Sequence, residues 1–397
     1  MMNAVEYFKR LKTYCEQENF KGWDPYDGLN SKVFQVTPLK HSKFARLAWI
    51  QLFKRSPINL RPLLKVTKGY NPKGIGLFLT GYCNLYKIAG SGNTTFGSTD
   101  ELEKKITHLA DLLIELQSEG YSGACWGYNF DWQARGGLFF PAGTPNVVAT
   151  TFATYGLLDA YSILGNKNIK NTTVTAAEFV INDLSRTHKE EGFLFSYAPR
   201  FGNNTVYNAS LLASKLLARI YSITSEEDYV QASRQSVVAC CNAQNEDGSW
   251  RYGELSIQNW IDSFHTGFNL EALYDYQKYT GDDSFAAHFD KGFQYYVDTF
   301  FLGDGTPKYY HDEVYPIDIH SPAQLLMTLY KCERFDNNEE LARQVSSWTI
   351  ENMQDESGYF YYQIKKLFKN KIPYMRWSQA WIFCALSYHL REVYGNN

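Results

Sequence analysis

The chain has 397 residues, of which 44% are hydrophobic and 20% are charged, so it can bury a large core and global disorder is excluded. Lys and Arg number 39 against 42 Asp and Glu, and a net charge of −3 offers no basic excess for nucleic-acid binding. The length suits one large domain or two ordinary ones.

The amino terminus and the cysteines bear on where the protein works. Residues 1–10 show no apolar segment leading to a small-residue cleavage site, so we expect no secretory signal. The apolar stretches are short and interrupted, which argues against a membrane span. Seven scattered cysteines without a Cys-x-x-Cys pattern indicate buried free thiols. We therefore predict a cytoplasmic protein.

The elements begin, in chain order, with a helical extension over residues 1–42. A weak helical pair follows, over residues 44–53 and 75–89. Ser98 to Glu101 then reads as a capping box that precedes an amphipathic helix. Similar helices begin near Ser225, Asp282 and Asn337. Each has one apolar face, as outer helices do.

Five turns that combine glycine with an aromatic residue recur along the chain, and an apolar helix ending near a tyrosine follows each of them. These tyrosines are separated by 60, 55, 54 and 58 residues. The turns cover residues 123–128, 192–195, 247–252, 304–309 and 357–360. The helix predicted over 147–161 is apolar or small on nearly every side, which is typical of a buried helix.

Each repeat thus pairs an amphipathic outer helix with a buried inner one. With the pair at 44–89 this makes six hairpins, and we predict an all-α (α/α)6 toroid over residues 43–397. Long loops, with short strands in some of them, would gather at one end. An open solenoid and a β-rich fold are the alternatives.

Residues 244–250, Gln-Asn-Glu-Asp-Gly-Ser-Trp, resemble the Gln-to-Trp repeat of terpenoid cyclases and protein prenyltransferases, and residues 354–359 resemble a degenerate copy. The resemblance implies an α/α toroid and nothing about the reaction. The sequence lacks the Asp-x-Asp-Asp motif of the cyclases and a zinc-binding Asp, Cys and His set at prenyltransferase spacing.

A second resemblance is local. Residues 260–269 resemble the Trp-Asp-Tyr-His-Thr segment in the toroid of glucuronyl 5-epimerases, and residues 144–150 take the place of another inner-helix entry. More broadly, the chain resembles toroid proteins of bacterial surface-polysaccharide biosynthesis. This implies a carbohydrate ligand, such as an acidic oligosaccharide or a lipid-linked saccharide.

The long loops are predicted at the end where the inner helices begin, over residues 120–145, 190–204, 245–262, 303–319 and 355–376. Long loops in a compact domain are usually functional. Helix N-termini carry partial positive charge, so this end favours an anionic ligand.

Four residues are predicted to be catalytic. His265 would act as a base, with its tautomer set by Asp262. Arg376 would neutralise a substrate carboxylate, and Tyr374 would return the proton. The alternatives are a polar helix cap for Asp262 and His265, and a core tyrosine for Tyr374.

The predicted substrate-binding residues are aromatic, amide, charged or imidazole side chains in these loops, since sugar rings stack on aromatic faces and hydrogen-bond to polar groups. They are Trp126, Asp131, Trp132, Arg135, Asn146, Tyr207, Asn208, Trp260, His320 and Trp377. Trp126 and Trp260 could instead be turn-packing residues. We predict no metal and no cofactor. Asp318, His320 and His311 are possible metal ligands, but a capped turn is the simpler interpretation.

The sequence thus favours an enzyme that binds or converts an acidic saccharide by epimerisation, elimination or hydrolysis. A non-catalytic toroid that binds a glycan or a protein is the alternative, and isoprenoid chemistry is a weaker third. No P-loop, Gly-x-Ser-x-Gly or His-Glu-x-x-His motif is present.

Overall fold

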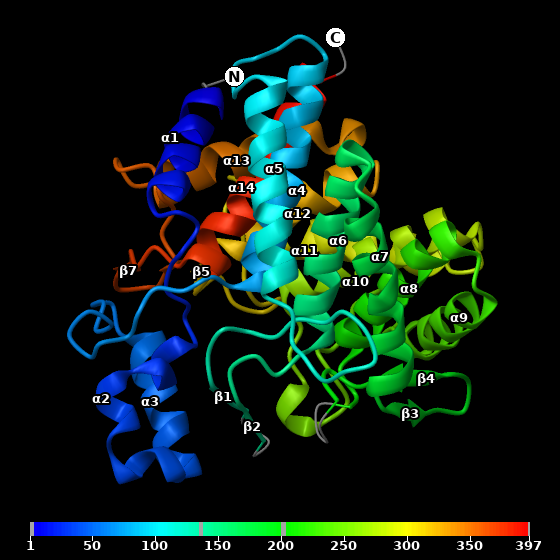
Figure 1. The fold of residues 1–397 in the computed structure, drawn as a ribbon, viewed down its shortest axis with the longest axis horizontal. Coiled ribbons are helices and arrows are strands. Elements are labelled where there is room, and N and C mark those ends of the chain that lie inside the picture. Colours follow the sequence, from blue (N-terminus) through cyan, green and yellow to red (C-terminus); the bar gives the residue numbers. More distant parts are fainter. Residues whose placement is uncertain (1–3, 135–137, 200–203, 396–397) are drawn as a thin grey trace.

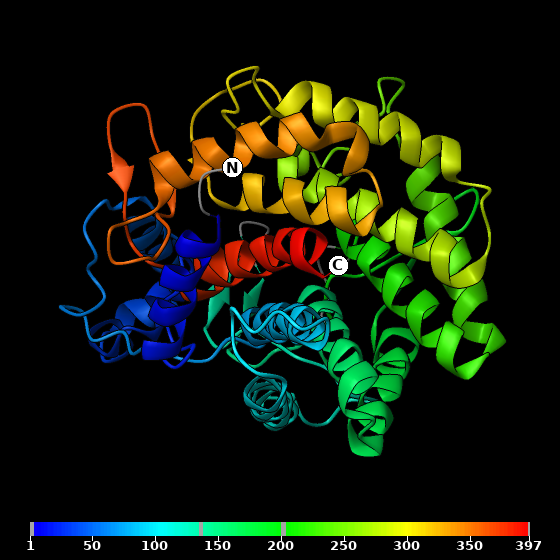
Figure 2. The same ribbon diagram turned by 90° about the horizontal axis from the view of Figure 1, so that it is seen from above.

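A computed structural model describes residues 4–134, 138–199 and 204–395. Six inner helices form a ring: α4 (Pro72–Gly90), α6 (Val147–Leu164), α8 (Tyr207–Thr224), α10 (Ser263–Thr280), α12 (His320–Lys331) and α14 (Ala380–Tyr394). Each contacts the next, and α14 contacts α4, so the ring is closed (Figures 1 and 2). The predicted all-α toroid is confirmed, and an open solenoid and a β-rich fold are excluded.

Six outer helices surround this ring: α5 (Thr99–Glu115), α7 (Lys167–Glu178), α9 (Glu227–Asn242), α11 (Ala286–Phe300), α13 (Glu339–Met353) and α1 (Ala4–Gln17). Helix α6 is buried on nearly all sides, whereas α5 buries one face only. The predicted capping box of Ser98 and Glu101 is present. The apolar patterns of the two helix classes therefore decided their layers.

The sixth outer helix corrects the predicted pairing. Helix α1 packs against α14, and Phe8, Leu11 and Cys15 are fully buried in the main core, so α1 is not an extension outside the ring. Helix α3 (Lys43–Arg55), expected to pair with 75–89, packs instead on η1 (Asp27–Asn30) and on strand β1. The apolar face of α1, at spacing i, i+3 and i+7, explains the difference because it fits the gap beside α14.

Residues 23–66 form a small lobe beside the ring. It contains η1, α2 (Lys32–Gln35), η2 (Pro38–His41) and α3. Its separate core consists of Leu29, Phe34 and Ile50. The lobe projects from the lower left of the molecule in Figure 1.

The repeated turns attach each outer helix to its neighbour. The Gln244 side chain donates to the carbonyls of Gly248 (2.9 Å) and His288 (3.0 Å), the latter on α11. Gln354 does the same with Gly358 (2.9 Å) and with Tyr7 (3.0 Å) on α1. A Cβ at Gly358 would lie 2.5 Å from the Arg10 carbonyl oxygen, so this turn requires glycine. The equivalence of the two turns explains why α1 takes the sixth outer place.

Long segments precede the inner helices and short ones follow them, as predicted. The long segments hold three antiparallel sheets: β1 (Trp132–Gln133) with β2 (Phe139–Phe140), β3 (Arg186–His188) with β4 (Phe193–Phe195), and β5 (Ile317–Asp318) with β6 (Gln363–Ile364) and β7 (Lys369–Asn370). Four short helical turns complete the chain: η3 (Phe179–Asp183), η4 (Ser256–Gln258), η5 (Asp336–Asn338) and η6 (Met375–Gln379).

Within the described residues one helix, Val147–Leu164, is long and apolar enough to cross a membrane by length and composition, but 72% of it is buried inside the ring. This is the environment of a core helix. All seven cysteines are free and buried, as the sequence predicted.

Candidate functional site

A cavity of about 270 Å³ opens where the inner helices begin, and helix α3 forms part of its wall. Aromatic side chains are the largest class in its lining. Among the described residues that line it, none is Asp or Glu, and the cations are Lys54, Lys73 and Arg376. The aromatic side chains are Tyr26, Tyr128, Phe130, Trp132, Tyr197, Tyr252, Trp260, Phe264, Phe268, Tyr309, Tyr310 and Trp377.

His265 lines this cavity and is held from behind by Asp262, the N-cap of α10. One Asp262 oxygen accepts the His265 backbone N–H (2.9 Å). The other lies 2.7 Å from His265 Nδ1 and accepts the Trp260 indole N–H at 2.9 Å. Asp262 is buried, whereas the His265 side chain is 20% exposed. The carboxylate favours a proton on Nδ1, so Nε2 is left as an acceptor. Asp262 therefore both caps helix α10 and orients the His265 ring.

Lys73 is a residue that the sequence analysis missed. It lies in the first turn of α4 and is 3% exposed. Its ammonium group lies 4.6 Å, 5.1 Å and 4.9 Å from the ring centres of Phe152, Phe268 and Trp381. No carboxylate in the described part of the chain forms an ion pair with it. Burial and the nearby charge of Arg376 lower the pKa of Lys73 well below its usual value. The sequence did contain a pattern that could have identified it: Lys73 directly follows Asn71-Pro72 at the start of an apolar helix.

His320 begins α12 and is completely buried, and neither ring nitrogen has a hydrogen-bond partner among the described residues. Its ring stacks on Phe264 at 4.4 Å and lies 4.0 Å from the Trp381 ring. Burial lowers the pKa of His320 well below its usual range, and the charges of Lys73, Arg376 and His265 act in the same direction. A buried imidazole without partners at the edge of a cavity is available to a ligand.

Asp318 supports this wall. It accepts hydrogen bonds from the His320 backbone (2.9 Å), the Trp377 indole (2.9 Å) and the Gln363 amide (2.6 Å). Burial raises the pKa of Asp318 to about 6. All of these contacts are to protein donors, and no metal-binding group of His, Cys, Asp and Glu is found within the described residues. The capped-turn interpretation of Asp318 and His320 is therefore the one that the geometry favours.

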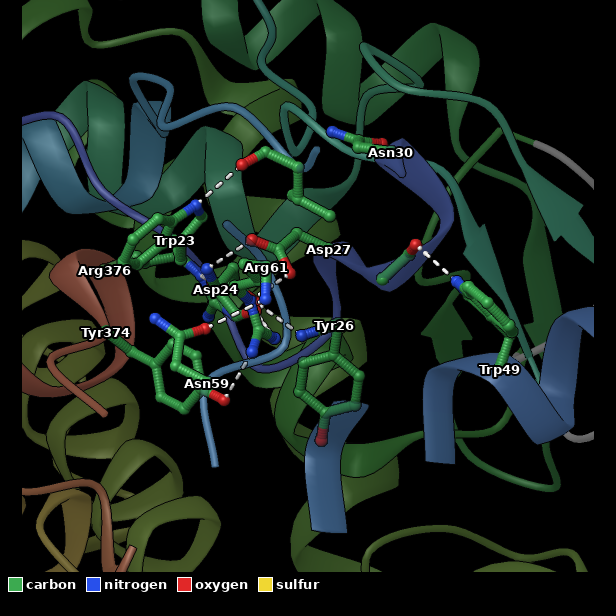
Figure 3. Close-up of polar contacts among 12 residues, drawn as sticks. Trp23, Asp24, Tyr26, Asp27, Asn30, Trp49, Asn59, Arg61, Tyr374 and Arg376 are labelled. Carbon is green, nitrogen blue, oxygen red and sulfur yellow. Dashed lines mark hydrogen bonds and ion pairs between the residues drawn. The ribbon is translucent and has the colours of Figure 1, made fainter. Parts of the chain in front are cut away.

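Two predicted catalytic residues are placed differently from expectation. Arg376 lines the cavity, but its guanidinium binds Asp24 at 2.5 Å and 2.8 Å, so its charge is already compensated. Tyr374 is buried outside the cavity, and its hydroxyl accepts a hydrogen bond from Arg61 at 3.0 Å. Figure 3 shows this network, in which Arg61 also binds Asp27 at 2.7 Å. It connects the small lobe to the start of η6.

The other predicted residues divide into two groups. Those that line the cavity are Trp132, Asn208, Trp260, His320 and Trp377. Those that do not are Trp126, Asp131, Asn146 and Tyr207. Trp126 donates to the Leu113 carbonyl in the core (2.7 Å), and Asn146 caps α6. Asp131 accepts from the Ala142 backbone (2.8 Å), and burial raises the pKa of Tyr207 to about 12. Arg135 lies outside the described residues.

A second cavity, of about 480 Å³, lies at the opposite end of the ring, where the inner helices finish. Its most buried charges are paired. Glu271 lies 3.4 Å from Lys215 and 2.8 Å from Lys331, and the Asp275 carboxylate lies 3.0 Å from Lys215. Arg219 binds Asp159 at 2.7 Å. These ion pairs close the ring on this side.

The sequence and the structure were compared with those of known proteins. The sequence matches no protein-family model and no curated protein. Among solved structures, cellobiose 2-epimerase from Bacillus thermoamylovorans is similar with a TM-score of 0.61 and 12% identity, over 82% of this chain and 90% of that one. An unsaturated glucuronyl hydrolase specific for heparin gives 0.59 and 12%, over 83% and 88%. A polysaccharide lyase gives 0.59 and 8%, over 98% and 97%. At these identities the likeness establishes the toroid fold alone.

Proposed function

We propose that this protein is an enzyme that removes a proton next to the carboxylate of an acidic saccharide, as an epimerase or a lyase. One observation carries the proposal: the buried Asp262 orients His265 toward an aromatic cavity that also contains Lys73, a cation without a carboxylate partner in the described chain. The carbohydrate-active enzymes that share the fold support a saccharide ligand.

The chemistry follows from these side chains. His265 Nε2 takes the proton from the carbon beside the carboxylate, and the electron pair of that bond moves into the carboxylate to form an enediolate. A bound carboxylate favours the charged form of Lys73, and the ammonium group then stabilises the added negative charge in a cavity that excludes water. Return of a proton to the opposite face of the sugar completes an epimerisation, and we assign this step to His320 rather than Tyr374 because only His320 of the two lines the cavity. The negative charge of the enediolate favours the protonated imidazole that the step needs.

The same intermediate leads to elimination when the group on the next carbon departs instead. Hydrolysis is less well supported, because it needs two carboxyl groups on either side of the bond. None of the described residues lining the cavity has one. Cytoplasmic location and a part in surface-polysaccharide biosynthesis remain predictions from the sequence.

The test is proton exchange. Purified protein is incubated in D2O with uronate oligosaccharides and, separately, with neutral ones, and NMR follows deuterium entering the carbon beside the carboxylate. Ultraviolet absorbance follows unsaturated products. We expect exchange or unsaturation with uronates only, and a loss of roughly 100- to 10,000-fold in His265→Ala.

His188→Ala is the matched control, because His188 is exposed on β3 and distant in sequence from the cavity residues. Exchange with neutral sugars alone would refute the acidic substrate. Binding of uronates without exchange or product would instead indicate the second candidate, a non-catalytic glycan-binding toroid.

A further inference from the structure

The charges of this protein are unevenly distributed. Residues 28–71 contain nine Lys and Arg and no Asp or Glu, and residues 365–371 contain four Lys and no acid. Without these 13 cations, 26 of the 39 Lys and Arg remain against all 42 Asp and Glu. Only Arg61 and Lys68 of the 13 have a carboxylate partner among the described residues. A strongly basic region is therefore hidden behind a net charge of −3.

The same region carries most of the exposed apolar side chains. Nine of the 15 large hydrophobic residues that are exposed in the described chain lie in these two segments. They are Val33, Val36, Leu39, Phe44, Leu52, Ile58, Leu63, Leu367 and Phe368. Leu367 is 91% exposed and Phe44 79% exposed, values that a monomer has no folding reason to maintain.

Helix α3 shows the pattern most clearly. Its inner face buries Ile50 and Phe53, while Phe44, Ala48 and Leu52 form an exposed row at spacing i, i+4 and i+8. A helix that is apolar on two sides needs something to cover the second side. Lys43 at one end and Arg55 at the other place cations beside this row.

The two segments are neighbours in space. The Asn370 amide donates to the Ser56 carbonyl at 3.1 Å, which joins the β6–β7 hairpin to the end of α3. Figures 1 and 2 both show the hairpin and the lobe on the same side of the molecule. We call the exposed residues of 32–68 and 365–371 together the basic apolar surface.

We propose that the basic apolar surface binds an anionic phospholipid membrane. Phe and Leu side chains enter the boundary between head groups and acyl chains, while lysines reach the negatively charged head groups. Long Lys and Arg stems extend along apolar surface and keep their charge in water, so the two residue types cooperate. A protein partner fits less well, because lysine is depleted at protein interfaces.

Membrane binding would have a consequence for the cavity. Leu47, Ile50 and Lys54 of α3 line the cavity wall, on the helix whose other face carries Phe44 and Leu52. A bound membrane would therefore lie on the far side of one helix from the cavity. This arrangement suits a saccharide that is presented at a lipid surface.

The experiment is vesicle co-sedimentation of the full chain. Phosphatidylcholine vesicles containing phosphatidylglycerol are compared with pure phosphatidylcholine vesicles, at low and high salt. We expect binding to the anionic vesicles only, weakened by salt. Both Phe44→Ser with Leu367→Ser and Lys365→Glu with Lys366→Glu should weaken it roughly tenfold or more.

The double variant Leu302→Ser with Val393→Ser is the matched control, since both residues are exposed outside this surface. It should bind like the unchanged protein. Absence of vesicle binding, or binding unaffected by the Phe44 and Leu367 changes, would overturn the proposal. So would self-association that those changes abolish, because a second copy would then cover the surface. The assay needs no substrate, so its outcome is separate from that of the proposed reaction.

Discussion

The two ends of the ring hold buried charge in opposite ways. Where the inner helices finish, Glu271 is shared by Lys215 and Lys331, and Asp159 binds Arg219. Where they begin, Lys73 is buried among aromatic rings and His320 is buried beside it, and within the described residues Lys73 has no carboxylate partner and neither His320 ring nitrogen has a hydrogen-bond partner. Both ends contain a cavity, of about 480 Å³ and about 270 Å³.

This difference separates structural from functional charge. A buried charge without a partner costs free energy of folding, and a fold has no reason to retain it unless a ligand completes it. At the paired end the buried charges neutralise one another, whereas at the other end Lys73 and His320 are left to interact with a ligand. Opposite effects of similar substitutions at the two ends are therefore expected.

The largest effect should come from Asp262→Asn. Asparagine keeps the N-cap acceptor for α10 but no longer fixes the proton on His265 Nδ1, so turnover should fall by roughly 100- to 10,000-fold. The melting temperature should change little. Turnover is measured on the substrate found by the exchange assay, and a loss of less than tenfold would contradict an orienting role.

Glu271→Ala tests the paired end. Removal of this carboxylate leaves Lys215 and Lys331 without their shared partner in a buried site, and unfolding free energy should fall by about 3–5 kcal/mol. Urea unfolding measures it. Glu333→Ala is the control, because Glu333 pairs with Lys278 at the surface, and we expect about 0–1 kcal/mol there. Equal losses would show that the ion pairs do not close this end.

Lys73→Met should have the opposite signature. The substitution removes a buried amine whose charged form is disfavoured and keeps an apolar side chain of similar length, so stability should stay within about 1 kcal/mol or rise. Turnover of an acidic substrate should fall by roughly 100-fold. Lys215→Met, at the other end, should instead destabilise the protein because Asp275 loses its ion-pair partner and Glu271 loses one of its two. Similar losses of stability in Lys73→Met and Lys215→Met would contradict the proposed difference between the two ends of the ring.

His320 gives the smallest effect, and it depends on pH. Burial lowers the pKa of His320 in the folded chain. As the pH falls below about 6.5, this histidine therefore becomes protonated in the unfolded chain but stays neutral in the folded chain. This contribution to stability is present above pH 6.5 and is lost as the pH falls below it. His320→Phe keeps a ring against Phe264 and should show a shallower loss of stability between about pH 7 and pH 5. Identical slopes in urea unfolding would contradict the depressed pKa.

Local patterns were enough to predict much of the fold. The recurring turns gave the number of hairpins, and helices that are apolar all round gave the inner layer, because both are properties of short segments. The pairing of α1 with α14 was missed, since it joins the two ends of the chain. A weak apolar helix at 44–53 looked equally suitable, and only closure of the ring selected between the two.

The site divides in the same way. His265 and Asp262 are three residues apart at a helix start, so their contact followed from the sequence. Asp24 and Arg376 are 352 residues apart. No local sequence pattern could show that Asp24 would bind the Arg376 guanidinium, which was predicted to bind the substrate. Lys73 was missed because what distinguishes it is a buried position with no carboxylate partner among the described residues. A sequence does not show which side chains surround a lysine.

The sequence by itself determined the toroid, the end at which the loops gather, and the pairing of His265 with Asp262, because hydrophobic periodicity and helix capping act over a few residues. The tertiary structure decided which helix closes the ring, which arginine is already neutralised, and which cation remains for a ligand. It also brought the basic, apolar segments 32–68 and 365–371 to one side of the molecule. These outcomes depend on contacts between segments that are distant in the sequence. Local sequence patterns carry no information about the energies of such contacts.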